Sequence, residues 1–154
     1  MKKLVIFGLC FLAAGCYQKN SNQIKQDAMT EIKASLDKCS EAEFCKKLVN
    51  NKQSKVPGIS HENMHFCGDI FDTSKQMSIV DFNVYNQQKE VACGVVNGTS
   101  VAGNKLGRQF IYVGGFVNTV YLKPSLAEYP SKINPVVMSK ALEIYQKMYQ
   151  ENCK

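Results

Sequence analysis

The sequence predicts an α+β domain in which a mostly antiparallel β-sheet packs against N-terminal and C-terminal helices and is stabilised by disulfides. Near both ends of the chain, apolar residues recur every three or four positions, as on one face of a helix. In the middle they alternate or run together between turns that contain Gly and Pro. Helices kept apart from consecutive strands are typical of the α+β class.

Two helices are expected before the sheet. Residues 23–38 carry an apolar stripe made of Ile24, Ala28, Ile32, Leu36 and Cys39. Ser40 and Glu43 have the spacing of a capping box, in which the hydroxyl and the carboxylate each accept a backbone N–H at the start of a helix. The sequence therefore predicts a second, short helix that ends at Val49.

Three stretches predict the strands. In "MSIVDFNVY" the period of two places Ser78, Val80, Phe82 and Val84 on one face, and Asp81 and Asn83 on the other. The apolar "EVACGVV" predicts a more central strand, and "RQFIYVGGFVNTVYL" predicts two further strands separated at Gly114 and Gly115.

A last helix is expected near the C-terminus. Asn134 followed by Pro135 favours a helix start, because asparagine caps helices and the first helical position needs no N–H. The expected buried stripe consists of Val137, Ala141, Ile144 and Met148.

The first residues have the layout of an export signal. "MKKLVIFGLCFLAAGC" combines a basic start, an apolar run too short to span a bilayer, and small residues before Cys16. "LAAGC" resembles the lipobox of bacterial lipoproteins, which implies cleavage before Cys16 and acylation of that residue. We expect a signal peptide in residues 1–15, a lipidated tether in 16–23 and a single α+β domain in 24–154.

The residue after the lipidated cysteine influences sorting in such lipoproteins. Tyr17 is not the aspartate that resembles an inner-membrane retention signal. We therefore expect the lipid to hold the protein in the outer membrane, facing the periplasm.

Loss of Lys2 and Lys3 with the signal lowers the formal net charge from +6 to +4, one unit per lysine. The remaining charge forms no basic block, so no nucleic-acid partner is expected, and weak attraction to anionic lipid or glycan is all that it supports.

The cysteines fit an oxidising compartment. Of the 7 cysteines, Cys10 leaves with the signal and Cys16 carries lipid, so an odd number remains. The sequence contains no C-x-x-C pair of the kind that structural zinc sites use. We expect disulfides between Cys39 and Cys45 across a helix corner and between Cys93 and Cys153, which leaves Cys67 free.

A second resemblance covers residues 91–115. This stretch is similar to a segment of small, largely uncharacterised proteobacterial exported proteins, in which a C-G-x-V-N strand end precedes a Gly-rich turn and an aromatic strand. The matching positions are Cys93, Gly94, Val96, Asn97, Gly103, Gly107, Arg108, Phe110 and Ile111. The resemblance implies no activity, and the segment fits a structural hairpin as well as a ligand site.

The stretch "HENMHFCG" raises the possibility of an enzyme. H-E-x-x-H-x-x-G resembles the start of the metzincin peptidase motif, which implies zinc ligands at His61 and His65 and a general base at Glu62. Phe71 stands where that motif has its third ligand, and Pro57 and Gly58 oppose the helix that should carry it. The other interpretation is a loop with solvated histidines.

Taken together, these features favour a membrane-anchored binding or envelope-interaction module. It would act on an envelope protein or glycan, without catalysis or cofactor. One alternative is a zinc peptidase built on His61, Glu62 and His65. Another is an inhibitor or exclusion lipoprotein, although no residue identifies that role.

Overall fold

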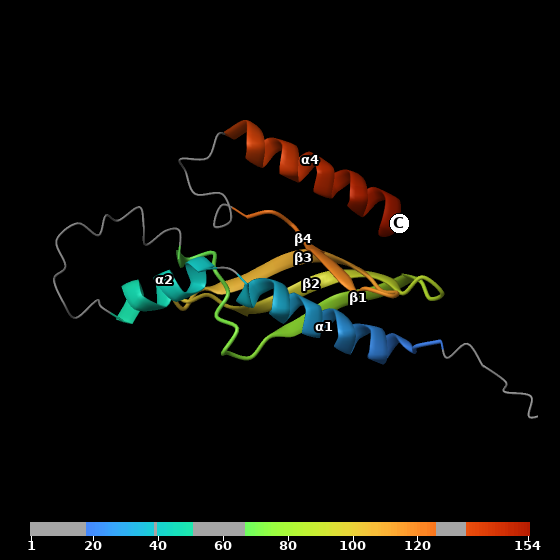
Figure 1. Ribbon diagram of the computed structural model, residues 1–154, viewed down its shortest axis with the longest axis horizontal. Coiled ribbons are helices and arrows are strands. Elements are labelled where there is room, and N and C mark those ends of the chain that lie inside the picture. Colours follow the sequence, from blue (N-terminus) through green and yellow to red (C-terminus); the bar gives the residue numbers. More distant parts are fainter. Residues whose placement is uncertain (1–17, 39, 51–66, 126–134) are drawn as a thin grey trace, which may run out of the picture.

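The structure, a computed structural model, describes residues 18–38, 40–50, 67–125 and 135–154. Within them lie helices at both ends of the chain and a four-stranded antiparallel sheet in the order β1-β2-β3-β4, which confirms the predicted α+β class. The elements are α1 (Ser21–Asp37), α2 (Ser40–Asn50), β1 (Ser78–Asn86), β2 (Val91–Thr99), β3 (Lys105–Val113), β4 (Thr119–Leu122) and α4 (Pro135–Asn152). Figure 1 shows α1 and α4 on opposite sides of the sheet, with α2 at one end.

Helix α1 lays the predicted stripe on one face of the sheet, here called the inner face. Its four buried side chains are Ile24, Ala28, Ile32 and Leu36. The helix starts with a capping box: the Asn20 side chain accepts from the Gln23 N–H at 3.0 Å, and the Gln23 side chain accepts from the Asn20 N–H at 2.8 Å. The first helical turn therefore lies within the predicted tether, which was expected to continue to Gln23.

The inner face is closely packed at its centre. Phe110, Tyr112, Val96 and Ala92 are buried there against α1. Gly94, opposite Phe110 in the register, leaves room for the ring, because a Cβ at Gly94 would lie 3.1 Å from it. A larger residue at this position would push the ring or the strand aside.

Strand β1 departs from the predicted alternation. Asp81 has a φ of 50°, and together with Phe82 it lies opposite the single residue Gly94, which is the geometry of a β-bulge. Because the extra residue shifts the period, Ile79 rather than Val80 shares the inner face with Phe82, and Val80 is 37% exposed. The predicted common face of Ser78, Val80, Phe82 and Val84 is thus wrong in its first half.

Helix α4 covers the opposite, outer face of the sheet. Tyr145 is buried against Ile111, and Met148 and Tyr149 pack beside it. The predicted stripe lies only partly on this face: Met148 packs there, whereas Val137 is 45% and Ile144 is 54% exposed. The reason lies at the end of the helix: Tyr145, Tyr149 and Cys153 follow each other at intervals of four, and the disulfide of Cys153 turns their side toward the sheet.

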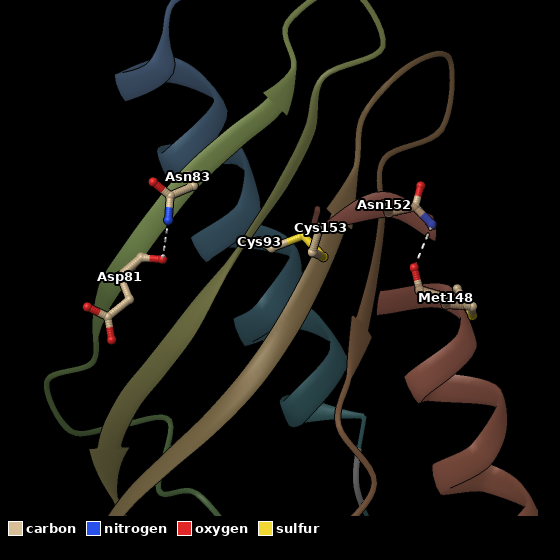
Figure 2. The surroundings of a disulfide bond; sticks show 6 residues. All are labelled: Asp81, Asn83, Cys93, Met148, Asn152 and Cys153. Carbon is tan, nitrogen blue, oxygen red and sulfur yellow. Dashed lines mark hydrogen bonds between the residues drawn. A yellow bond between two sulfur atoms is a disulfide. The ribbon is translucent and has the colours of Figure 1, made fainter. Parts of the chain in front are cut away.

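Figure 2 shows this disulfide, which joins Cys93 on β2 to Cys153 at the end of α4. The Cα atoms of the pair lie 5.9 Å apart, so the sequence prediction for these two cysteines is confirmed. Beside it, the Asn152 side chain donates a hydrogen bond to the Met148 carbonyl at 2.8 Å and so satisfies one of the last carbonyls of α4.

The other predicted disulfide is wrong. Cys45 pairs with Cys67, not with Cys39, at a Cα separation of 5.5 Å, so Cys67 is not free. Helix α2 already begins at Ser40, and at about 1.5 Å per residue the backbone rises about 7.5 Å from there to Cys45. That exceeds the distance of about 7 Å beyond which two cysteines cannot be bridged without backbone movement. Cys39 itself lies outside the described residues.

The Cys45–Cys67 disulfide holds α2 at the end of the sheet that carries the β2–β3 turn. Both cysteines are buried with Ile70 and Val101, and the latter lies in that turn. Backbone hydrogen bonds extend the contact, from the Val101 N–H to the Ile70 carbonyl at 2.9 Å and from the Asp72 N–H to the Thr99 carbonyl at 2.8 Å. The segment after Cys67 is thereby fixed to the sheet.

Removing either disulfide should lower the free energy of unfolding according to the length of the loop that it closes. The separations are 60 residues for Cys93–Cys153 and 22 for Cys45–Cys67. Chain entropy predicts losses of about 4 kcal/mol for C93A/C153A and about 3 kcal/mol for C45A/C67A. Urea unfolding under non-reducing conditions would measure both, with C39S as the control because Cys39 is in neither bond. Equal stability of C93A/C153A and the parent protein would contradict this.

Candidate functional site

The residues of the zinc-peptidase alternative, His61, Glu62 and His65, lie outside the described residues. That alternative therefore stays a prediction. The described chain resumes at Cys67, which is 1% exposed. Across the four described segments, no group of three or more His, Cys, Asp or Glu side chains could hold a metal ion.

Within residues 91–115, the segment that resembles other exported proteins, Arg108 makes several polar contacts. Its side chain is buried, and it donates hydrogen bonds to the Asp69 carbonyl at 3.2 Å and to the Ser125 hydroxyl at 2.6 Å. The guanidinium also stacks over the Phe71 ring, 5.5 Å from its centroid. Arg108 therefore links β3 to the segments before β1 and after β4.

Two other residues of this resemblance are paired on neighbouring strands. Asn97 on β2 pairs with Gly107 on β3, and a Cβ at Gly107 would lie 3.0 Å from the Asn97 side-chain oxygen. Gly98, the next residue after Asn97, lies against Phe71: a Cβ added at Gly98 would be 2.9 Å from the Phe71 ring. The segment thus permits close packing, as expected of a structural hairpin, and it also leaves a surface open beside β3.

That open surface exists because β4 is short. Strand β4 pairs only with residues 110–113, and the Lys123 N–H adds one bond to the Gln109 carbonyl at 2.9 Å. Among the described residues, Lys105, Leu106 and Gly107 have no strand on that side. An edge with exposed backbone donors and acceptors is a template for an added extended segment.

Two hollows meet at Leu106 and Gly107 on this edge, and we call them together the β3 groove; the second extends from there across the ends of β2 and β1. One has a volume of about 290 Å³ and the other about 610 Å³, and they share Leu106 and Gly107. The first is lined also by Asp69, Phe71, Arg108, Gln109, Lys123, Pro124 and Ser125, and the second by Gln76, Met77, Ser78, Asn97, Gly98, Thr99 and Lys105. Three cationic side chains and one carboxylate give the groove an excess of positive charge, which suits a polar, anionic ligand.

A second polar cluster surrounds Asp72, beside the same end of the sheet. The Ser74 hydroxyl donates to the Asp72 carboxylate at 2.6 Å, and the ammonium groups of Lys46 and Lys75 each lie 3.6 Å from it. The Ser74 hydrogen bond, helped by these cations, holds the pKa of Asp72 below its ordinary value. The cluster ties α2 to the segment before β1, and the local D-x-S spacing is the one sequence signal for it.

A third cluster, at the opposite end of the sheet, fixes the chain just before α1. The Lys19 ammonium lies 2.8 Å from Asp27 on α1 and 2.9 Å from Glu90 at the β1–β2 turn. These hydrogen-bonded carboxylates raise the pKa of Lys19 above its ordinary value. The Gln87 side chain also donates to the Lys19 carbonyl.

This Lys19 cluster could not be found from the sequence, because Glu90 lies 71 residues from Lys19. It includes the neighbouring strand end as well. The Gly114 N–H donates to the Glu90 carbonyl at 3.1 Å, and a Cβ at Gly114 would collide with the Glu90 side chain. Lys19, the β1–β2 turn and the start of the β3–β4 loop therefore meet at one point.

Comparison with known proteins gives no match, either with a family model, with a curated protein or with a solved structure. Among the helices of the described segments, none has the length and apolar character needed to cross a membrane.

Proposed function

We propose that the protein is a lipoprotein anchored in the outer membrane through Cys16 and facing the periplasm, where its domain binds another component of the envelope. The observation that carries the anchor is the sequence "LAAGC", a small-residue cleavage site directly before a cysteine, preceded by a short apolar run. Two disulfides agree with an exported protein, because such bonds persist in oxidising compartments.

The position of the anchor would decide which end of the domain lies nearest the membrane. Only Tyr17 and Gln18 separate Cys16 from Lys19, so at about 3.6 Å per extended residue the two Cα atoms lie within about 11 Å of each other. Lys19 in turn is fastened to Asp27 and Glu90. The end of the sheet with the β1–β2 turn would then face the membrane.

The β3 groove lies toward the opposite end and would be presented to the periplasm. It begins at Lys105, directly after the β2–β3 turn, whereas Val91 and Val113 are paired at the membrane-facing end. Its open strand edge and its cationic side chains support binding of an acidic segment of an envelope protein or of an anionic glycan. We propose binding, without catalysis or cofactor, as the role of the domain.

Two alternatives remain beside this proposal. The zinc peptidase depends on His61, Glu62 and His65, and zinc near one equivalent in the purified protein would favour it. The inhibitor or exclusion lipoprotein shares the anchor and differs only in its partner, which would be an incoming enzyme or phage protein. The identity of the captured partner separates this role from ours.

Replacing Cys16 by Ser should abolish lipid labelling and release the protein from membranes. The physical reason is that acyl chains are the only proposed attachment strong enough to hold a small polar domain. Metabolic labelling with a fatty acid, followed by membrane fractionation, measures both effects. Unchanged membrane association of C16S would contradict the proposed anchor.

Reversing charge in the β3 groove should weaken partner capture. Lys105 and Lys123 line the two hollows, and neither takes part in the Lys19 or Asp72 cluster. In pull-downs from crosslinked envelopes we expect K105E/K123E to recover the specific partner at least about tenfold less, since like-charge contacts replace favourable ones.

The matched control for this experiment is K140E/K147E. Lys140 and Lys147 are exposed on α4, outside the groove, so the same change of charge there should leave capture unaltered. Equal recovery with K105E/K123E and with the parent protein would show that the groove is not the binding surface. Equal loss with K140E/K147E would show that only net charge matters.

A further inference from the structure

The loop between β3 and β4 presents two apolar side chains to solvent. Phe116 has a relative exposure of 106% and Val117 of 72%, the highest values among the exposed large apolar side chains of the described segments. Single exposed apolar residues are common on protein surfaces. Phe116 and Val117, however, are adjacent and lie at a particular end of the molecule.

The loop lies at the end of the sheet where the chain enters the domain. Gly114, two residues before Phe116, is hydrogen-bonded to Glu90, and the Glu90 carboxylate holds Lys19 at 2.9 Å. Cys16 precedes Lys19 by three residues. Figure 1 shows the start of α1 and the β1–β2 turn together at this end, with α2 at the other.

Two glycines, Gly114 and Gly115, shape the start of the β3–β4 loop. Gly114 passes under the Glu90 side chain, which leaves no room for a Cβ. Gly115 follows with a φ of 139°, a conformation that residues with a Cβ rarely adopt, and its surroundings are open. These two glycines turn the chain away from the sheet, so Phe116 and Val117 stand clear of the core.

We infer that Phe116 and Val117 insert into the phospholipid surface beside the acylated Cys16, as a second, shallow contact of the domain with its membrane. This inference rests on the proposed lipid anchor at Cys16. An anchor within about 11 Å of Lys19 brings this end of the sheet to the headgroup region, where apolar side chains of surface-bound segments reach about 5–10 Å deep.

Charge on the same end permits a lipid surface as the occupant. Lys19 and the exposed Lys89 of the β1–β2 turn balance the carboxylates of Asp27 and Glu90, so these four residues carry no net charge that would repel anionic headgroups. An exposed lysine at the membrane-facing end is attracted to such headgroups. The loop and the turn would therefore fix the tilt of the domain, which the acyl chains alone leave free.

The absence of tryptophan from the chain offers a direct test. In full-length, acylated F116W the new side chain is the sole tryptophan, and Phe116 is so exposed that the change should not disturb the fold. The protein is placed in phospholipid vesicles that contain anionic lipid, with or without bromine on the upper acyl chains. Insertion predicts about a twofold loss of tryptophan fluorescence in the brominated vesicles, because bromine quenches on contact at that depth.

The matched control is F44W. Phe44 is 50% exposed on α2, at the far end of strands of nine residues that span about 30 Å. Its fluorescence should be the same in both kinds of vesicle. Vesicle flotation of both variants, run in parallel, reports on the anchor independently.

Each other outcome overturns the inference. Flotation without quenching of Trp at position 116 leaves the anchor standing and refutes insertion of the loop. Absence of both acylation and flotation refutes the anchor, and the inference falls with it. A blue-shifted emission that depends on protein concentration but not on bromine would show that a second copy of the chain covers Phe116 instead.

Discussion

Burial of the α1 stripe against the inner face of the sheet is the interaction on which the rest of the structure depends. Ile24, Ile32 and Leu36 are each almost fully removed from water, which is worth about 2 kcal/mol per side chain. Without α1, the inner-face residues Phe110 and Tyr112 would be open to solvent. Because a capping box from Asn20 to Gln23 fixes the start of the helix, the position of α1 also decides where the N-terminal segment leaves the domain.

The two faces of the sheet are covered by different means. The inner face relies on a continuous apolar stripe, whereas α4 contributes one fully enclosed ring, Tyr145, and a covalent link through Cys153. The disulfide therefore sets which side of α4 turns inward. The molecule also has two functionally distinct ends under our proposals: Lys19 and the β3–β4 loop at the membrane, and the β3 groove away from it.

Most patterns within one element were predictable from the sequence, whereas among contacts between distant elements the sequence predicted the Cys93–Cys153 disulfide but missed Cys45–Cys67 and the Lys19 cluster. The stripe of α1 and the strands were found because periods of 3.6 and 2 arise from local geometry. The β-bulge at Asp81 interrupts the alternation of β1, and β1 contains no glycine or proline from which the bulge could have been predicted. Cys45 pairs with Cys67, 22 residues away, and not with the nearby Cys39. Tertiary packing brings Cys67 to α2, and the spacing of cysteines in the sequence does not predict such packing.

The same division applies to the candidate sites. Arg108 and Gly107 were singled out by resemblance, but their place beside an open edge depends on where β4 ends. The contact of Lys19 with Glu90 joins residues 71 positions apart and has no signature in the sequence. It is also the basis of the proposed orientation on the membrane. Nuclear Overhauser spectroscopy of isotope-labelled protein tests it most directly. We expect cross-peaks from the Lys19 side chain to both Asp27 and Glu90, whereas cross-peaks to neither, with averaged signals for Lys19, would contradict this contact.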